Sequence, residues 1–433
     1  MSFIALNQEG KKEILDTIGI KDEDELFETI PAPLRYKGRL NTQGPLDEES
    51  LRARFRFRAH DIVFAGGGIY NHHIPAVVDA IASRQEFYTA YTPYQPEISQ
   101  GTLQAIFEYQ SMMASLTNMY ASNASMYDGA TALAEAAIMA IRAKGIKKVV
   151  VTRATNPAYR AVIKAYLQFN YDIDLQDAPF NNKSGQVDLD LLKDMVSSDT
   201  AFFIQQPNFF GIIEPMDEIS QIVKMAGFWG IIVTEAISLG LLRPPGTFGP
   251  DVVVGEAQSF GNPPNAGGPL LGFFCTTKEY IRRMPGRIVG LSKDSSGRKA
   301  FCLTLATREQ HIRREKATSN ICSNQGLCAL RAAIYLSAIG PKGLRNIAIQ
   351  CASGARSLMK LIKGKGIDVI FSGPIFNEFV ARVDDARIKA LEENGILPGI
   401  RIEDLYPEIP DGILITVTEM NTKKDLKCMI ERL

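Results

Sequence analysis

Apolar residues recur at helical spacing early in the chain and form short continuous stretches further on. Residues 100–116 place apolar side chains on one helical face, and an alanine-rich stretch over 129–144, ended by Gly145, predicts a second helix. From Lys147 onward, short apolar strands alternate with helices, which indicates a mostly parallel sheet covered on both faces. The predicted strands are 149–151, 171–176, 202–204, 231–233, 252–254 and 272–274, and the predicted helices between them are 157–168, 189–196 and 219–226.

The last third of the chain predicts a smaller α/β unit. A helical region over 308–362, interrupted near Gly340-Pro341, leads into it. Its predicted strands lie near 369–371, 379–381 and 413–415, and its helices near 387–393 and 423–433. We therefore predict three parts: an N-terminal arm over 1–60, a large α/β domain over 61–310 and a small C-terminal α/β domain over 311–433.

Composition narrows the classes of function. The chain has 433 residues, with 48 basic and 48 acidic side chains, so no net charge attracts nucleic acid or an anionic membrane. The run of arginines at 52, 54, 56 and 58 is then best explained as a helix or arm whose arginines meet solvent or partner carboxylates. The polar N-terminus and the lack of an apolar span of about 20 residues predict a cytoplasmic protein.

Metal and dinucleotide sites are not indicated. The six cysteines form no CxxC pair, and the chain has only four histidines, of which His72 and His73 are adjacent and would diverge in a helix. The three glycines at 66–68 would let the backbone approach another chain or a ligand, but they do not form a GxGxxG motif in a βαβ unit, so they do not predict a dinucleotide site.

Two loops carry candidate binding groups. Residues 91–101 read YTPYQPEISQG, in which two prolines stiffen a loop that bears tyrosine and glutamine side chains, suited to a small polar ligand or to a structural turn. Residues 123–131 place small residues, among them Asn123 and Ser125, before a helix start, as a phosphate cradle would. Asp128 at that start would cap the helix and repel a phosphate, so we expect no phosphate there.

A densely ionic segment covers 307–322. If it is helical, Glu309 pairs with Arg313 and His311 with Glu315 at a spacing of four residues, which predicts a solvated, salt-bridged helix. Residues 318–320 cluster beside it, which leaves a binding role open.

Together these strings resemble one family. YTPYQPEISQG, the loop at 123–131, PGRIVG at 285–290 and REQHIRREKATSNIC are similar to the P-protein of the glycine cleavage system, from about residue 35 to the end. The resemblance implies a pyridoxal phosphate enzyme of fold type I, with a large sheet domain and a small C-terminal domain. The family exists as one long chain or as split alpha and beta chains, and 433 residues have room for one half.

The missing lysine predicts which half this is. Pyridoxal enzymes hold the cofactor as a Schiff base with a lysine. No lysine occurs between Lys224 and Lys278, the window in which this fold carries it, and the match to the family places Ser259 near that position. The resemblance therefore implies an alpha half that binds no cofactor covalently, while the beta subunit holds pyridoxal phosphate.

The resemblance also implies partners and a reaction. The beta subunit would decarboxylate glycine and pass the aminomethyl group to the lipoyl arm of H-protein, and two alpha and two beta chains would fit the family. The alpha chain would present its 91–101 loop to the partner's site, with Tyr94, Gln95 and Glu97 closest and Tyr91 beside them. Two alternatives stay open: a self-sufficient enzyme that uses Lys278 or Lys293, and a non-catalytic scaffold for the beta chain.

Overall fold

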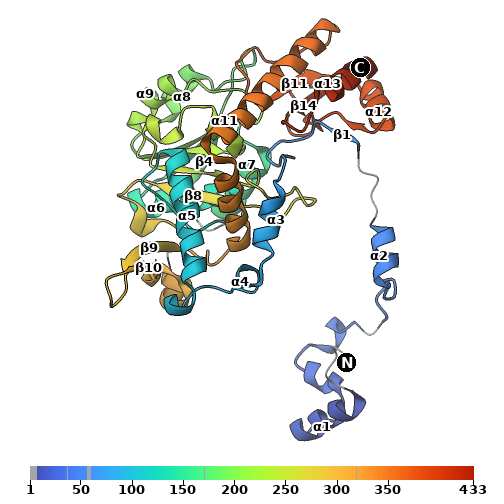
Figure 1. Cartoon of the computed structure of the whole chain (residues 1–433), viewed down its shortest axis with the longest axis vertical. Coiled ribbons are helices and arrows are strands. Elements are labelled where there is room, and N and C mark those ends of the chain that lie inside the picture. The colour runs from blue at the N-terminus through green and yellow to red at the C-terminus, as the bar shows by residue number, and fades with distance from the viewer. Residues whose placement is uncertain (1–6, 37, 56–59, 170, 318) are drawn as a thin grey trace. The chain divides into compact units, whose positions relative to one another are not determined.

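The computed structural model describes residues 7–36, 38–55, 60–169, 171–317 and 319–433, in two compact units, Met1–Arg58 and Ala59–Leu433 (Figure 1). The first unit contains α1 (Gln8–Ile18) and α2 (Glu48–Arg54), and none of its described residues is buried. Of the predicted basic run, Arg52 lies on α2 and pairs with Glu48, whereas Arg56 and Arg58 lie outside the described residues.

A seven-stranded sheet with the order β2-β8-β7-β6-β5-β3-β4 organises the second unit. Five neighbouring strands, β7 to β4 in that order, are parallel, and β8 runs antiparallel to β7 and β2. The mostly parallel sheet that the sequence predicts is confirmed. Its strands are β2 (Ala121–Ser122), β3 (Lys148–Thr152), β4 (Asp174–Ala178), β5 (Thr200–Gln205), β6 (Phe228–Val233), β7 (Val252–Glu256) and β8 (Gly272–Thr276).

Helices cover both faces because successive side chains of each strand point to opposite sides. Val149 and Val151 of β3 pack with α6 (Gly129–Lys144) and α7 (Pro157–Leu167). Val150 packs on the opposite face. The helices of that face include α3 (Ala76–Ala82), α5 (Gln100–Thr117), α8 (Leu189–Met195), α9 (Met216–Ile222) and the first part of α11 (Gly326–Gly364).

Three predicted elements differ from the structure in their extent. Residues 308–325 are not a continuous helix, because Arg314 and Asn324 adopt positive φ and only α10 (Gln310–Arg313) and short turns form in this range. The strand predicted at 171–176 begins at Asp174, since the N–H of Tyr171 still bonds back to the carbonyl of Leu167. Residues 369–371 form a single bridge, from Val369 to Ala381, before the chain turns away.

The kink predicted in the long helix is present in α11, at Gly340. Before it and as far as Ala352, the buried residues of α11 join the core of the large sheet; from Ala355 they join a second core. That core packs under a sheet of the order β11-β14-β13, which consists of β11 (Glu378–Arg382), β13 (Ile400–Arg401) and β14 (Gly412–Thr416). The second core also includes residues of α12 (Asp385–Glu393) and α13 (Lys423–Arg432).

Two further strand pairs were not predicted from the sequence. A short strand β1 (Ile62–Val63) pairs in parallel with β12 (Ile396–Leu397), so the start of this unit meets its C-terminal part. The hairpin β9 (Ile288–Lys293) and β10 (Lys299–Thr304) lies at the opposite end of the unit from α12 and α13 (Figure 1). Among the described residues, no helix combines the length and apolar character that a membrane span requires.

Candidate functional site

The carboxyl ends of the parallel strands form the edge where open α/β sheets bind their ligands. Polar side chains gather there, at the last residues of β5 and β7 and in the segments that follow β3, β6 and β7, and all are buried. They are Thr155, Asn156, Gln205, Thr234, Glu235, Glu256, Gln258 and Ser259.

The glycine-rich segment 66–70 of the same chain fills this edge. Asn156 donates a hydrogen bond to the carbonyl of Gly67 at 2.8 Å, and a Cβ on Gly68 would lie 2.7 Å from the same amide, so only glycine fits. Gln258 accepts from the N–H of Tyr70 at 2.9 Å and donates to its carbonyl at 3.0 Å. The glycines thus allow a close approach to the chain itself, where the sequence had suggested another chain or a ligand.

A charged cluster locks the end of that segment. His72 is buried, and its ring nitrogens lie 3.0 Å from a carboxylate oxygen of Glu235 and 2.7 Å from one of Glu419. Burial alone would lower the pKa of His72, but the two carboxylates raise it to about 10. Cys351 lies close enough to complete a metal-binding trio with His72 and Glu419, but both ring nitrogens of His72 already pair with carboxylates.

The start of α6 is occupied by carboxylates. Asp128 caps the helix, as predicted, and accepts from the N–H of Thr131 at 2.7 Å. Glu256, at the end of β7, accepts from the N–H of Gly129 at 3.1 Å, and burial raises the pKa of its carboxyl to about 7. A Cβ on Gly129 would meet the hydroxyl of Tyr159, so the space above this helix start is filled.

The other two residues of the predicted phosphate loop serve the surrounding structure. Asn123 donates to the carbonyl of Pro285 at 3.1 Å, and the hydroxyl of Ser125 accepts from the N–H of Gln325 at 3.2 Å. Both side chains are buried. They join the loop to the segments near 285 and 325, and they leave no donors directed at a phosphate.

No described lysine is buried, which bears on covalent cofactor binding. Lys224, Lys278 and Lys293 are exposed, and Lys278 lies 6.0 Å from the ring centroid of Tyr120 on the surface. Ser259, at the position matched to the missing lysine, is 3% exposed. Pyridoxal phosphate needs a lysine and anion-binding amides, so the described residues at these strand ends do not fit it.

A second polar centre forms around Arg287, a residue to which the sequence analysis gave no role. Its guanidinium donates to Glu309 at 3.0 Å, to the hydroxyl of Thr92 at 2.8 Å and to that of Ser323 at 2.7 Å. Its remaining nitrogen donates to the hydroxyl of Tyr94 at 2.8 Å. Burial alone would lower the pKa of Arg287, but Glu309 raises it above its ordinary value.

Arg287 thereby joins three of the strings that carry the family resemblance: the 91–101 loop, PGRIVG and the ionic segment. The expected pairs of Glu309 with Arg313 and of His311 with Glu315 are wrong, because Glu309 is buried and pairs with Arg287. The ring of His311 instead packs edge-on against Tyr94, with centroids 5.9 Å apart. The sequence signal for Arg287 itself was the string PGRIVG, in which it lies between Gly286 and Ile288.

The remaining residues of the 91–101 loop lie at the surface. Tyr91 is 84% exposed and Tyr94 is 50% exposed, while Gln95 and Glu97 are exposed outside the Arg287 centre. The structure therefore brings Tyr94 to Arg287 but leaves Tyr91, Gln95 and Glu97 without a common contact to it.

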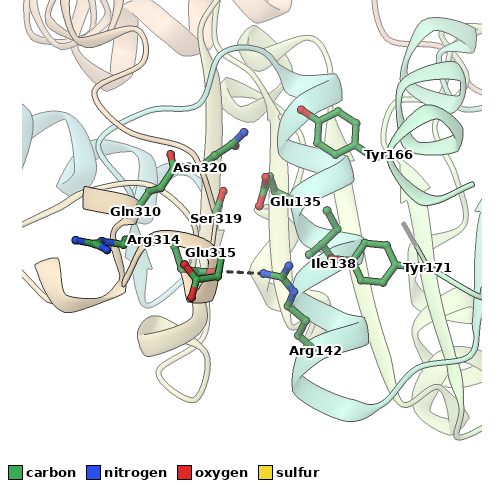
Figure 2. Close-up of a pocket in the computed structure, with 11 residues that line it drawn as sticks. Glu135, Ile138, Arg142, Tyr166, Tyr171, Gln310, Arg314, Glu315, Ser319 and Asn320 are labelled. Atoms are coloured by element: carbon green, nitrogen blue, oxygen red, sulfur yellow. Dashed lines mark hydrogen bonds between the residues drawn. The ribbon is translucent and has the colours of Figure 1, made fainter. Parts of the chain in front are cut away.

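Two cavities lie in this unit, and the ionic segment lines the first of them. One, of about 540 Å³, lies between α6 and residues 310–320, and Figure 2 shows Glu135 and Arg142 facing it from the helix. Burial raises the pKa of Glu135 to about 7. The other, of about 300 Å³, is bordered by residues 91–93, Arg287 and the start of α11, and its walls are mostly apolar.

Comparison with known proteins identifies the class first. The fold matches a NifS-like protein with a TM-score of 0.61 at 13% identity, covering 86% of this chain and 97% of that one, which shows the fold type I architecture alone. A crystal structure of glycine decarboxylase (P-protein) of the glycine cleavage system, in inhibitor-bound form, matches with a TM-score of 0.87 and 37% identity over 100% of this chain and 99% of that one.

The sequence matches then give the family. The family model for the glycine cleavage system P-protein matches residues 1–433. A probable glycine dehydrogenase (decarboxylating) subunit 1 of Bacillus licheniformis is 45% identical over 100% of this chain and 98% of its own length, and one of Moorella thermoacetica is 44% identical over 99% and 98%. The chain therefore belongs to the glycine cleavage system P-protein family, as the subunit 1 half of its split form.

Proposed function

We propose that this chain is the half of a glycine decarboxylase that binds no pyridoxal phosphate of its own and completes the cofactor site of a second subunit. With that subunit it would decarboxylate glycine and deliver the aminomethyl group to the lipoyl arm of H-protein. Its compartment would be the cytoplasm. The observation that carries the proposal is the blocked start of α6, where Asp128 and Glu256 take the amides that a phosphate would need.

The loop at 91–97 is the proposed contribution to the second subunit's site. Arg287 holds Thr92 and Tyr94 from within the chain, so the loop is pre-organised before any partner binds. Tyr91, Gln95 and Glu97 are exposed beside them and would be available to a partner chain. A tyrosine hydroxyl held by a guanidinium can orient a carboxylate or a cofactor substituent without moving a proton.

The proposal is tested by the visible absorption spectrum. This chain, purified alone, is incubated with pyridoxal phosphate and dialysed, and the measurement is repeated with subunit 2 present. We expect no Schiff-base band from the chain alone and a band from the complex. A persistent band from the isolated chain, trapped by borohydride on one of its lysines, would overturn the proposal and favour the self-sufficient enzyme.

A further inference from the structure

The 540 Å³ cavity beside α6 has a buried carboxylate in its wall. Glu135 is 5% exposed, and Figure 2 shows it facing the cavity from the helix. Burial raises the pKa of its carboxyl to about 7, and a hydrogen bond from Ser319 and the charge of Arg142 offset that rise only in part. Among the residues that the structure describes, no basic side chain forms an ion pair with Glu135. A buried carboxylate without such a partner is unfavourable, so its position in the wall of a cavity favours a bound cation.

Aromatic and apolar side chains border the same end of the cavity. Tyr166 of α7 and Tyr171, which follows that helix, line the side of the cavity opposite residues 310–320 (Figure 2). After burial, the charge of Glu135 is the next cause that raises the pKa of Tyr166, so the carboxylate and the phenol lie close to each other. Aromatic rings attract an ammonium ion, and the buried Ile138 adds aliphatic surface beside them. This end of the cavity therefore suits a primary ammonium that is attached to an apolar group.

Basic side chains gather at the exposed rim of the cavity. Arg142 and Arg314 line it and are exposed, and the cavity continues along α6 toward Arg283 and Lys316. Among the described residues of this lining, the only exposed carboxylate is that of Glu315. The rim is therefore positive, whereas the buried end of the cavity is negative. An anionic group would be attracted to the rim and repelled from the buried end.

We propose that this cavity binds the zwitterion of an amino acid with an apolar side chain. The ammonium would pair with Glu135, and the carboxylate with Arg142 or Arg314. The side chain of the ligand would contact Ile138. A volume of 540 Å³ lies within the range of about 300–1,000 Å³ that is usual for small-molecule sites. None of the described lining residues belongs to the 91–97 loop, so the inference does not depend on the proposed function.

The test measures the binding of L-leucine to the full complex with subunit 2 by isothermal titration calorimetry. Glu135→Gln removes the negative charge and keeps the shape of the side chain, so the variant should fold. Glu392→Gln, at an exposed position of α12, is the matched control. We expect Glu135→Gln to raise the Kd for leucine about tenfold or more, because the ammonium loses a charged partner. The Kd of the Glu392→Gln complex should equal that of the wild type.

Two analogues of leucine separate the roles of the two charges. Isocaproate lacks the ammonium, and isoamylamine lacks the carboxylate, while both keep the apolar side chain. We expect each analogue to bind the wild-type complex about tenfold or more weakly than leucine, because each loses one of the two ion pairs. Isocaproate that binds as tightly as leucine would make this an anion site, and isoamylamine that does so would make it an amine site. Either result would overturn the inference.

Three further results would contradict the inference. The first is a wild-type complex that binds no leucine. The second is an unchanged Kd in the Glu135→Gln complex, which would place the leucine elsewhere. The third is leucine that binds the chain alone but not the complex, which would show that subunit 2 covers the cavity. In contrast, loss of the Schiff-base band from a wild-type complex that still binds leucine would refute the proposed function and leave this inference intact.

A second measurement needs no variant. Photo-leucine, an analogue of leucine that carries a diazirine on its side chain, is photoactivated in the wild-type complex, and labelled peptides are mapped by mass spectrometry. Labelling within 135–142, 166–171 or 310–320, suppressed by excess leucine but not by isocaproate, would support the proposed site. Labelling confined to other regions of either subunit would exclude it.

Discussion

Glu256, at the end of β7, accepts a hydrogen bond at 3.1 Å from the backbone N–H of Gly129, the first residue of α6. The same carboxylate accepts from the N–H groups of Gln258 and Leu271, at 2.9 Å and 2.7 Å. One buried side chain thus satisfies amides of three segments around the strand ends. These backbone N–H groups, which could otherwise bind an anion, are already hydrogen-bonded within the protein.

Restoring the lysine should therefore not restore a cofactor site. We expect Ser259→Lys to give no Schiff-base band with pyridoxal phosphate, because segment 66–70 fills the space and Ser259 is 3% exposed. Burying an unpaired ammonium should also lower the free energy of unfolding by roughly 3 kcal/mol or more. Absorption spectra and urea unfolding measure the two effects.

The matched control for this change is Ser292→Lys, since Ser292 is exposed on β9. Its free energy of unfolding should change by no more than about 0.5 kcal/mol. A stable, yellow Ser259→Lys protein would show that the strand ends open readily and that only the lysine was missing.

Loss of the proton from His72 should lower the free energy of unfolding of the chain at alkaline pH. Its pKa is raised to about 10 in the folded protein from an ordinary 6.5, so the folded state holds the proton more tightly. The contribution of His72 is complete below about pH 6.5 and is lost as the pH rises through about 10. The free energy of unfolding should accordingly fall across that window.

Replacing His72 separates this effect from the rest of the protein. His72→Gln should lower the free energy of unfolding at pH 7 by about 3–5 kcal/mol, because two buried carboxylates lose their cation. It should also flatten the fall between pH 6.5 and 10. His73→Gln is the control, since His73 is exposed. Equal pH profiles for wild type and His72→Gln would mean that His72 is neutral when folded.

Arg287 should not tolerate lysine. A lysine ammonium cannot reproduce the planar fork that bonds Glu309, Thr92 and Tyr94 at once. We expect Arg287→Lys to cost about 3 kcal/mol in the free energy of unfolding, because Glu309 stays buried without a well-placed partner. Arg298→Lys, at an exposed pair with Asp294, should cost at most about 1 kcal/mol. Similar losses in the free energy of unfolding for both variants would mean that Arg287 stabilises the protein no more than an exposed ion pair does.

Tyr94→Phe tests whether the loop reaches the partner's site. Loss of one hydrogen bond made during the reaction should lower kcat about tenfold, while assembly with subunit 2 stays intact. Tyr120→Phe, an exposed tyrosine that makes no contact with Arg287, should leave kcat unchanged. If Tyr94→Phe turns over normally in an intact complex, the chain acts as a scaffold for subunit 2.

The strongly periodic parts of the chain were predictable from the sequence. Helix α6 begins at Gly129 and ends at Lys144, as predicted, because Asp128 caps its start and Gly145 adopts positive φ at its end. The central strands were also predictable, since a strand buried on both faces is a nearly continuous apolar run. The structure of the ionic segment was not predictable. Its charges fit an exposed helix surface, and the sequence does not show the distant residues with which they pair.

The sequence by itself determined the fold class, the family and the absence of a lysine between Lys224 and Lys278, because these depend on local pattern and on residue identity. Only the tertiary structure decided that Glu309 is buried against Arg287 and that segment 66–70 closes the strand ends. Contacts between residues far apart in the chain compete with local spacing, and the burial that makes them strong leaves no periodic signal.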